Sequence, residues 1–166
     1  MKVQASATPT SLTIDPNDPT NYTLAILGDL HMDPRDTDHS YEGRDHIKKI
    51  LDESPNPFLV SLGDLGESKD VNESKQLFAG TTDCFKMVRG FLDGFEHKYD
   101  IVGGNHDLEG IDEFATDADN LEAYLREMGK ETPQFCHEIA PKTLIVGLGS
   151  TQFRDAQYTS HEVSLF

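Results

Sequence analysis

Four short apolar runs, each followed by glycine and polar residues, place the strongest constraint on the fold of this chain. They are Tyr22–Leu27, Phe58–Leu62, Tyr99–Val102 and Thr143–Val146. Runs this short and rich in leucine, isoleucine and valine are typical of strands that are buried on both faces. A further strand is predicted at Gln134–Ile139, so five strands are expected in all.

Amphipathic helices are predicted between these strands. Apolar residues recur at steps of three and four in Gly43–Glu53, Phe85–Phe95 and Leu121–Met128, and the last of these stops at Gly129. Strands that alternate with helices imply a layered α/β domain with right-handed crossovers. The acidic segment Asp33–Glu42 lacks the register of a calcium-binding loop, so we expect a solvated loop near the mouth of a site.

The charge of the chain limits its partners. The formal net charge is −16, from 30 acidic and 14 basic residues among 166. This charge opposes binding to nucleic acid and to anionic membranes, so neither partner is expected. A phosphate ligand would need local positive charge, and a bound metal ion is one source of it. The plain alternative is that the acidity serves solubility alone.

The chain is expected to have two parts. Residues 1–21 are rich in Ser, Thr, Pro and Asp and are predicted to be a flexible leader, followed by one domain at residues 22–166. Neither a secretory signal nor a membrane-spanning run is recognisable, so we expect a cytoplasmic protein, or an organellar one if a transit segment was removed. Cys84 and Cys136 are far apart in sequence, and both are predicted to be buried thiols.

Polar residues directly follow each of the first three predicted strands. The clusters are Gly28-Asp29-Leu30-His31, Gly63-Asp64-Leu65-Gly66-Glu67 and Gly103-Gly104-Asn105-His106-Asp107. In open α/β sheets, ligands bind just beyond the carboxyl ends of the strands. We therefore expect the three clusters to meet in space and to form one site.

The residue types in these clusters suit a divalent metal ion. Asp29 and Asp64 offer carboxylate oxygens, and His31 offers an imidazole nitrogen. Asn105 adds an amide oxygen. If the first strand continued, the two-residue step from Asp29 to His31 would place both side chains on one side, within reach of one ion. The alternative for the aspartates is turn formation, and for His106 it is a structural hydrogen bond.

Three motifs resemble those of a known family. Asp29-x-His31, Gly63-Asp64 and Gly104-Asn105-His106-Asp107 look like the first three motifs of the calcineurin-like metallophosphoesterases. The resemblance extends from about Tyr22 to Val146. It implies the N-terminal half, in β-α-β-α-β order, of that family's layered α-β-β-α sandwich.

The resemblance also implies a dinuclear metal centre. It assigns Asp29 and His31 to one ion, makes Asp64 the bridge between two ions, and gives Asn105 to the second. The ions implied are divalent, such as manganese, iron or zinc. Two ions roughly 3.5 to 4 Å apart can activate a shared water and neutralise charge on a phosphoryl group.

Two further residues take catalytic roles by the same resemblance. His106 protonates or stabilises the leaving oxygen, and Asp107 orients its ring. The reaction implied is hydrolysis of a phosphomonoester or phosphodiester, with a small-molecule or nucleotide-like substrate. Nothing in the sequence indicates the oligomeric state.

The later part of the chain departs from the family pattern. A complete member supplies another strand-end histidine and a Gly-His-x-His motif, yet no Gly-His pair occurs in the sequence. His161 follows a polar stretch and is not expected to be the missing ligand. We therefore expect a domain truncated at its C-terminus that holds metal weakly. The alternative function is a catalytically incompetent fragment or splice form with a partial metal site, acting at most as a binding module.

Overall fold

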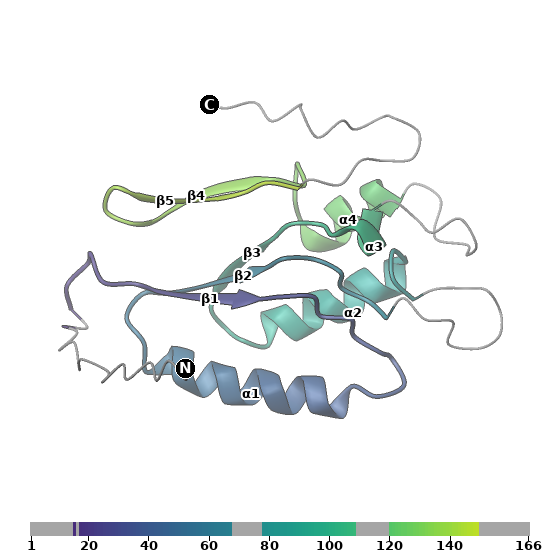
Figure 1. The fold of residues 1–166 in the computed structure, drawn as a ribbon, viewed down its shortest axis with the longest axis horizontal. Helices are drawn as coiled ribbons and strands as arrows, with labels where there is room; N and C mark the ends of the chain where they lie inside the picture. Colours follow the sequence, from purple (N-terminus) through teal and green to yellow (C-terminus); the bar gives the residue numbers. More distant parts are fainter. Residues whose placement is uncertain (1–14, 16, 68–77, 109–119, 150–166) are drawn as a thin grey trace, which may run out of the picture.

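The computed structural model describes residues 15, 17–67, 78–108 and 120–149. Helices and strands alternate along this part of the chain (Figure 1). Their bounds are β1 Thr23–Leu27, α1 Asp38–Asp52, β2 Pro57–Ser61, α2 Thr82–Asp93, β3 Lys98–Ile101, α3 Asn105–Leu108, α4 Asn120–Met128, β4 Phe135–Ala140 and β5 Thr143–Gly147. The α/β class predicted from the sequence is confirmed, as a parallel sheet alternating with helices and a small antiparallel hairpin.

The three-stranded sheet is parallel and has the order β1-β2-β3. Its register sets Leu27 beside Ser61 and Ser61 beside Ile101, so the three strands end at one level. A helix joins each neighbouring pair, α1 between β1 and β2 and α2 between β2 and β3. The loops that follow the strands therefore leave from the same edge of the sheet.

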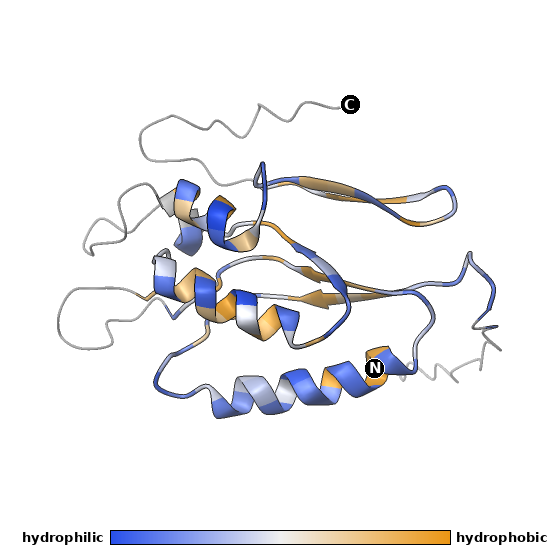
Figure 2. Ribbon diagram, turned by 180° about the vertical axis from the view of Figure 1, so that it is seen from behind, coloured by the Kyte–Doolittle hydropathy of each residue, from blue (hydrophilic) through white to orange (hydrophobic). Residues whose placement is uncertain are grey.

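Helices α1 and α2 lie on one side of this sheet (Figure 1). Leu59 and Ile101 of the sheet share one apolar core with side chains of α2 and α4. The large side chains that α2 and α4 bury completely in this helix-side core include Phe85, Leu92 and Tyr124. Figure 2 shows hydrophobic residues in the strands and on α2, and mostly hydrophilic residues along α1.

The hairpin β4-β5 covers the opposite face of the sheet (Figure 1). Phe135 of β4 packs there in a second apolar cluster with Phe58 and Val60 of β2. Asp100 of β3 adds polar contacts, because its carboxylate pairs with Lys130 and lies 2.6 Å from Nε2 of His137. The hairpin is therefore packed on the sheet by both apolar and polar contacts.

Burial of β5 corrects a prediction from the sequence. The apolar run Thr143–Val146 is expected to be buried on both faces, but residues of β5 alternate between half-buried and exposed. Leu144 is 63% exposed and Val146 is 52% exposed. An antiparallel pair can leave one face open. The prediction also fails for β1, in which no residue is buried and Ile26 is 60% exposed.

Helix α1 begins earlier than the sequence predicts. The segment Asp33–Glu42 is expected to be a solvated loop, yet the helix starts at Asp38. The ring of Tyr41 explains the extension, because it packs edge-on against Phe91 of α2. The guanidinium of Arg44 lies over the same ring, 4.8 Å from its centre. The contact between Tyr41 and Phe91 holds the first turns of α1 against α2.

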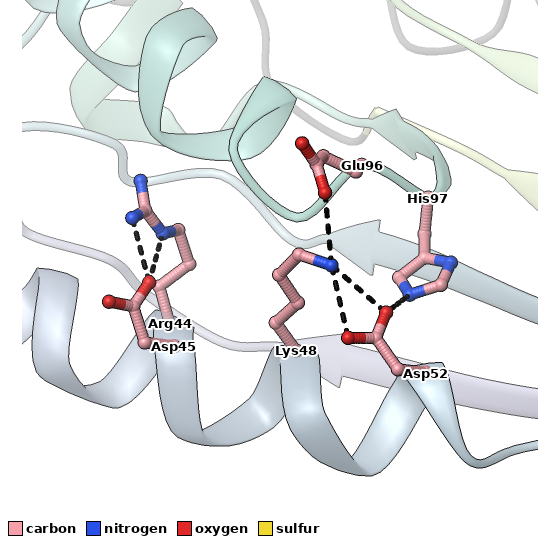
Figure 3. Close-up of polar contacts among 6 residues, drawn as sticks. All are labelled: Arg44, Asp45, Lys48, Asp52, Glu96 and His97. Carbon is pink, nitrogen blue, oxygen red and sulfur yellow. Dashed lines mark hydrogen bonds and ion pairs between the residues drawn. The ribbon is translucent and has the colours of Figure 1, made fainter.

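Polar contacts fasten α1 to the turn between α2 and β3 (Figure 3). The Nζ atom of Lys48 lies 2.9 Å from Oδ1 of Asp52 and 3.1 Å from Oε2 of Glu96. The Nε2 atom of His97 lies 2.9 Å from the same oxygen of Asp52. A hydrogen bond from Lys48 holds the pKa of Asp52 below 3.8. Leu51 is the buried residue of α1. Because α1 buries little apolar surface, these polar contacts also help to hold it in place.

The two cysteines differ in exposure. Cys84 of α2 is buried, which confirms the prediction for this residue. Cys136 of β4 is exposed, so the prediction of a buried thiol there is wrong. Burial raises the pKa of the Cys84 thiol well above its ordinary value.

Some predictions concern residues outside the described part of the structure. Of the expected leader, residues 1–14 and 16 lie outside it, and so do residues 150–166 with His161. Within the described ranges, no helix has the length and apolar character needed to cross a membrane.

Candidate metal centre

The first and second strand-end clusters run side by side beyond β1 and β2. The N–H of His31 donates to the carbonyl oxygen of Asp64 at 2.8 Å, and the N–H of Met32 donates to that of Leu65 at 2.9 Å. A bridge between Met32 and Gly66 continues the parallel pairing. Backbone bonds therefore hold His31 and Asp64 next to each other, as their strand-end positions predict.

Two glycines bring the third cluster against the second. A Cβ atom added to Gly63 would lie 2.2 Å from the backbone nitrogen of Gly104, and one added to Gly104 would lie 2.1 Å from Oδ1 of Asp64. Gly63 also has a φ of +93°, which residues with a side chain rarely adopt. The close approach of the two loops thus depends on glycine at both positions.

Three side chains meet where these loops converge. His31, Asp64 and His106 each offer one ligand atom, and the three atoms all lie within 4.8 Å of one another. The backbone N–H of His106 donates to Oδ1 of Asp64 at 3.1 Å. The rings of His31 and His106 are edge-on to each other, with their centres 5.5 Å apart. These three half-buried side chains could hold a metal ion.

Two of these residues have an unusual backbone conformation. The φ angle is +39° at His31 and +47° at Asp64, in the left-handed region that favours glycine. Such conformations cost about 1–3 kcal/mol each and are concentrated at functional sites. The next residues hold them in place, because Met32 and Leu65 are both buried in the helix-side core. The backbone therefore turns His31 and Asp64 toward the third cluster. The buried side chains of Met32 and Leu65 fix the two loops to the core.

Asp107 links the second cluster to the third through hydrogen bonds of its carboxylate. Its side chain is fully buried and accepts hydrogen bonds from the N–H of Leu65 at 2.8 Å and of Gly104 at 2.9 Å. Burial raises the pKa of Asp107 to about 7, although these hydrogen bonds lower it. This role in joining two loops is not visible in the sequence, where an acidic residue after a histidine has no distinguishing signal.

The role expected for Asp107, orienting the ring of His106, stays a prediction. The Nδ1 atom of His106 is buried and has no hydrogen-bond partner among the described residues. The carboxylate of Asp107 accepts hydrogen bonds from the backbone N–H groups of Leu65 and Gly104, among others. The described contacts of Asp107 thus position the loop that carries His106.

The structure does not test the other two predicted ligands. Asp29 is exposed and lies outside the group formed by His31, Asp64 and His106. Asn105 begins α3, and its side chain is not among those that the structure describes. The roles of Asp29 and Asn105 as ligands stay predictions from the family resemblance. His106 is expected in this site from its place in the third cluster, as a catalytic residue, and the structure brings it beside His31 and Asp64.

Comparison with known proteins adds no relative. No model of a protein family matches the chain, and a search of curated proteins found no match. The resemblance to calcineurin-like metallophosphoesterases therefore rests on the residues of the three motifs, and the function is inferred from the site.

Proposed function

We propose that this protein is a metal-dependent hydrolase of phosphate esters, acting on monoesters or diesters. One observation carries the proposal: three strand-end clusters converge so that His31, Asp64 and His106 share a potential metal site. They do so beyond the carboxyl ends of parallel strands, where open α/β sheets bind their ligands. Two imidazoles and a carboxylate are also a donor set of catalytic zinc and iron sites.

A metal ion would supply the positive charge needed to bind an anionic ester to this acidic protein. The net charge of −16 repels an anionic ester. A bound divalent ion reverses the local potential, lowers the pKa of a bound water and polarises the phosphoryl oxygens. An acidic protein with a metal centre at the sheet edge can therefore bind and hydrolyse a phosphate ester.

The family resemblance supplies the finer part of the proposal. In it, Asp29, His31, Asp64 and Asn105 hold two ions, and His106 protonates the leaving oxygen. The fold proposed with it is the α-β-β-α sandwich, in which the hairpin belongs to a second sheet. Packing of the hairpin on the face opposite the helices supports this architecture.

Hydrolysis of p-nitrophenyl phosphate and its bis ester, with added Mn²⁺, tests the proposed function. Asp64→Asn is expected to lower turnover by about 100-fold or more, because it removes a charged ligand at the centre of the site. Asparagine tolerates the left-handed backbone of position 64, so the fold is expected to persist. Asp36→Asn, on an exposed residue, is the matched control and is expected to keep the rate. Equal turnover in the Asp64→Asn variant and the unaltered protein would contradict the proposal.

Binding without catalysis is the second candidate function. It is favoured by the small donor set, because His31, Asp64 and His106 are the one group of three or more His, Cys, Asp or Glu ligands found among the described residues. Three ligands cannot fill the sites of two ions. Metal binding without turnover of either ester would support this alternative, and two tightly bound ions per chain would contradict it.

A further inference from the structure

We propose that Ile26 and Leu62 form an apolar patch beside the candidate metal centre that binds the hydrocarbon group of a phosphate ester. The substrate class is then an ester that carries an alkyl chain or an apolar ring. This inference rests on the proposed function, because the patch binds the organic part of the same ester whose phosphate the metal centre binds. It adds two residues that determine specificity and changes no metal ligand or catalytic role.

Both residues of the apolar patch lie on the face of the sheet that carries the hairpin. Side chains alternate between the two faces of a strand. Leu24 and Val60 belong to the apolar cluster on the hairpin side. Ile26 and Leu62 each follow two residues later, so they point to the same face. The N–H of Leu62 donates to the carbonyl oxygen of Leu27 at 2.9 Å, which continues the parallel pairing beyond the end of β2.

The hairpin leaves this part of the face uncovered. Val102, just beyond β3, is 9% exposed and packs in one cluster with Phe135 of the hairpin. Ile26 is 60% exposed, and Leu62 is 48% exposed. Cover by the hairpin therefore extends over the β3 side of the sheet and not over the apolar patch on the β1 side.

Open space adjoins Leu62 on the β1 side. The register pairs Leu27 with Ser61, so the next residues, Gly28 and Leu62, are neighbours across the two strands. A Cβ atom added to Gly28 would meet no atom within 4 Å. The missing side chain of Gly28 thus leaves room beside Leu62 for an apolar group of a ligand.

The apolar patch is next to two of the strand-end clusters that form the candidate metal centre. Leu62 is two residues before Asp64, and Gly28 directly precedes Asp29. At a rise of about 3.3 Å per residue, Leu62 lies about 7 Å along the chain from Asp64. Ile26 lies about 10 Å from Asp29 on the same basis. A hydrocarbon group attached to a phosphate at the metal centre can therefore reach the patch.

Position distinguishes the patch from other exposed apolar residues. Leu144 is 63% exposed, but it lies near the turn that joins β4 and β5 and belongs to no strand-end cluster. Single exposed apolar side chains of this kind are ordinary. Two such side chains beside open space and beside a metal centre can instead bury part of the ester. Each CH₂ group that is fully buried strengthens binding by about 4-fold.

Hydrolysis of methyl and hexyl p-nitrophenyl phosphate with added Mn²⁺ tests the inference. The two diesters have the same leaving group and differ in the hydrocarbon alone. We expect kcat/KM for the hexyl ester to exceed that for the methyl ester by about 10-fold in the unaltered protein, because the patch covers part of the chain. Ile26→Ser and Leu62→Ser are each expected to lower this ratio by about 3-fold. Leu144→Ser is the matched control and is expected to keep it.

A binding measurement applies when a variant does not fold or when no ester is turned over. Hexylphosphonate, which has no ester bond, is titrated into the unaltered protein with Zn²⁺, and the methyl signals are followed by NMR. We expect the signals of Ile26 and Leu62 to shift and that of Leu144 to stay, with no such shifts from methylphosphonate. Unshifted signals of Ile26 and Leu62 would overturn the inference, and so would their persistent contact with another segment or a second copy of the chain.

The two experiments separate this inference from the proposed function. Turnover of the methyl and hexyl esters at equal kcat/KM, or a preference for hexyl that both serine variants keep, would overturn the apolar patch and leave the proposed function in place. Shifts at Ile26 and Leu62 without turnover of either ester would refute the proposed function and leave the binding role of the patch in place.

Discussion

Gly104 lies so close to Asp64 that a Cβ atom on the glycine would stand 2.1 Å from Oδ1 of the aspartate and 2.5 Å from its backbone nitrogen. A side chain at Gly104 therefore has to displace the central candidate ligand or its loop. We expect Gly104→Ala to weaken Co²⁺ binding by at least about 10-fold and to lower the free energy of unfolding by about 1–3 kcal/mol. Metal titration and urea denaturation measure the two effects.

Gly28→Ala is the matched control for this prediction. Gly28 also precedes a candidate aspartate at the end of a strand, but an added Cβ there meets nothing within 4 Å. We expect the substitution to change the free energy of unfolding by less than about 0.5 kcal/mol and to leave metal binding intact. Equal effects of the two substitutions would show that close packing of the loops does not support the site.

The order of elements along the chain and the meeting of the three clusters could be predicted because both follow from local patterns. A short apolar run followed by glycine and a polar cluster indicates where a strand ends, and parallel strands joined through helices bring such ends to one edge. His31 and Asp64 lie at that edge, as their sequence positions predict. The exposure of β5 could not be predicted, because an apolar run does not show whether another layer covers it.

The finer geometry of the site depends on backbone angles that the sequence does not display. Left-handed φ angles at His31 and Asp64 arise because Met32 and Leu65 are buried and because the two loops are paired. These are tertiary contacts between residues more than thirty positions apart. Asp29 lies outside the group of His31, Asp64 and His106, and its role as a ligand stays a prediction.

Asp107 is expected to stabilise the loops of the site through its backbone hydrogen bonds, which include those from Leu65 and Gly104. Asp107→Ala leaves the buried N–H groups of Leu65 and Gly104 without their acceptor, so we expect the free energy of unfolding to fall by about 2–4 kcal/mol. Asp107→Asn keeps one acceptor oxygen and is expected to lose about half as much. Urea denaturation in the presence of a chelator measures both. An unchanged midpoint in Asp107→Ala, as expected for the exposed control Asp36→Ala, would refute this role.

The two thiols are expected to react at very different rates with an aromatic disulfide reagent. The thiolate is the reactive form of cysteine, and burial both shields Cys84 and raises its pKa. We therefore expect one thiol, that of the exposed Cys136, to react in the native protein, and the second to react only after unfolding in guanidinium. Cys136→Ser should abolish the fast reaction, and Cys84→Ser should keep it. Two fast equivalents in the native protein would contradict the burial of α2 against the sheet.

The contacts of α1 predict a depressed pKa for Asp52, with Lys48 as its main cause. The hydrogen bond from Lys48 holds the pKa of Asp52 below 3.8 in the folded protein. The stabilising contribution of this carboxylate is therefore present above about pH 3.8 and is lost as the pH falls through the lower folded-state value. In Lys48→Met, carbon NMR titration of Asp52 should show a pKa closer to 3.8, with the smaller effect of His97 remaining. Lys49→Met, which changes the neighbouring residue on α1, is the control. Among the described ion pairs Lys49 has no contact with Asp52, so this variant should leave the pKa of Asp52 unchanged. An Asp52 pKa that is the same in the Lys48→Met variant and in the unaltered protein would mean that the contact drawn in Figure 3 does not persist in solution.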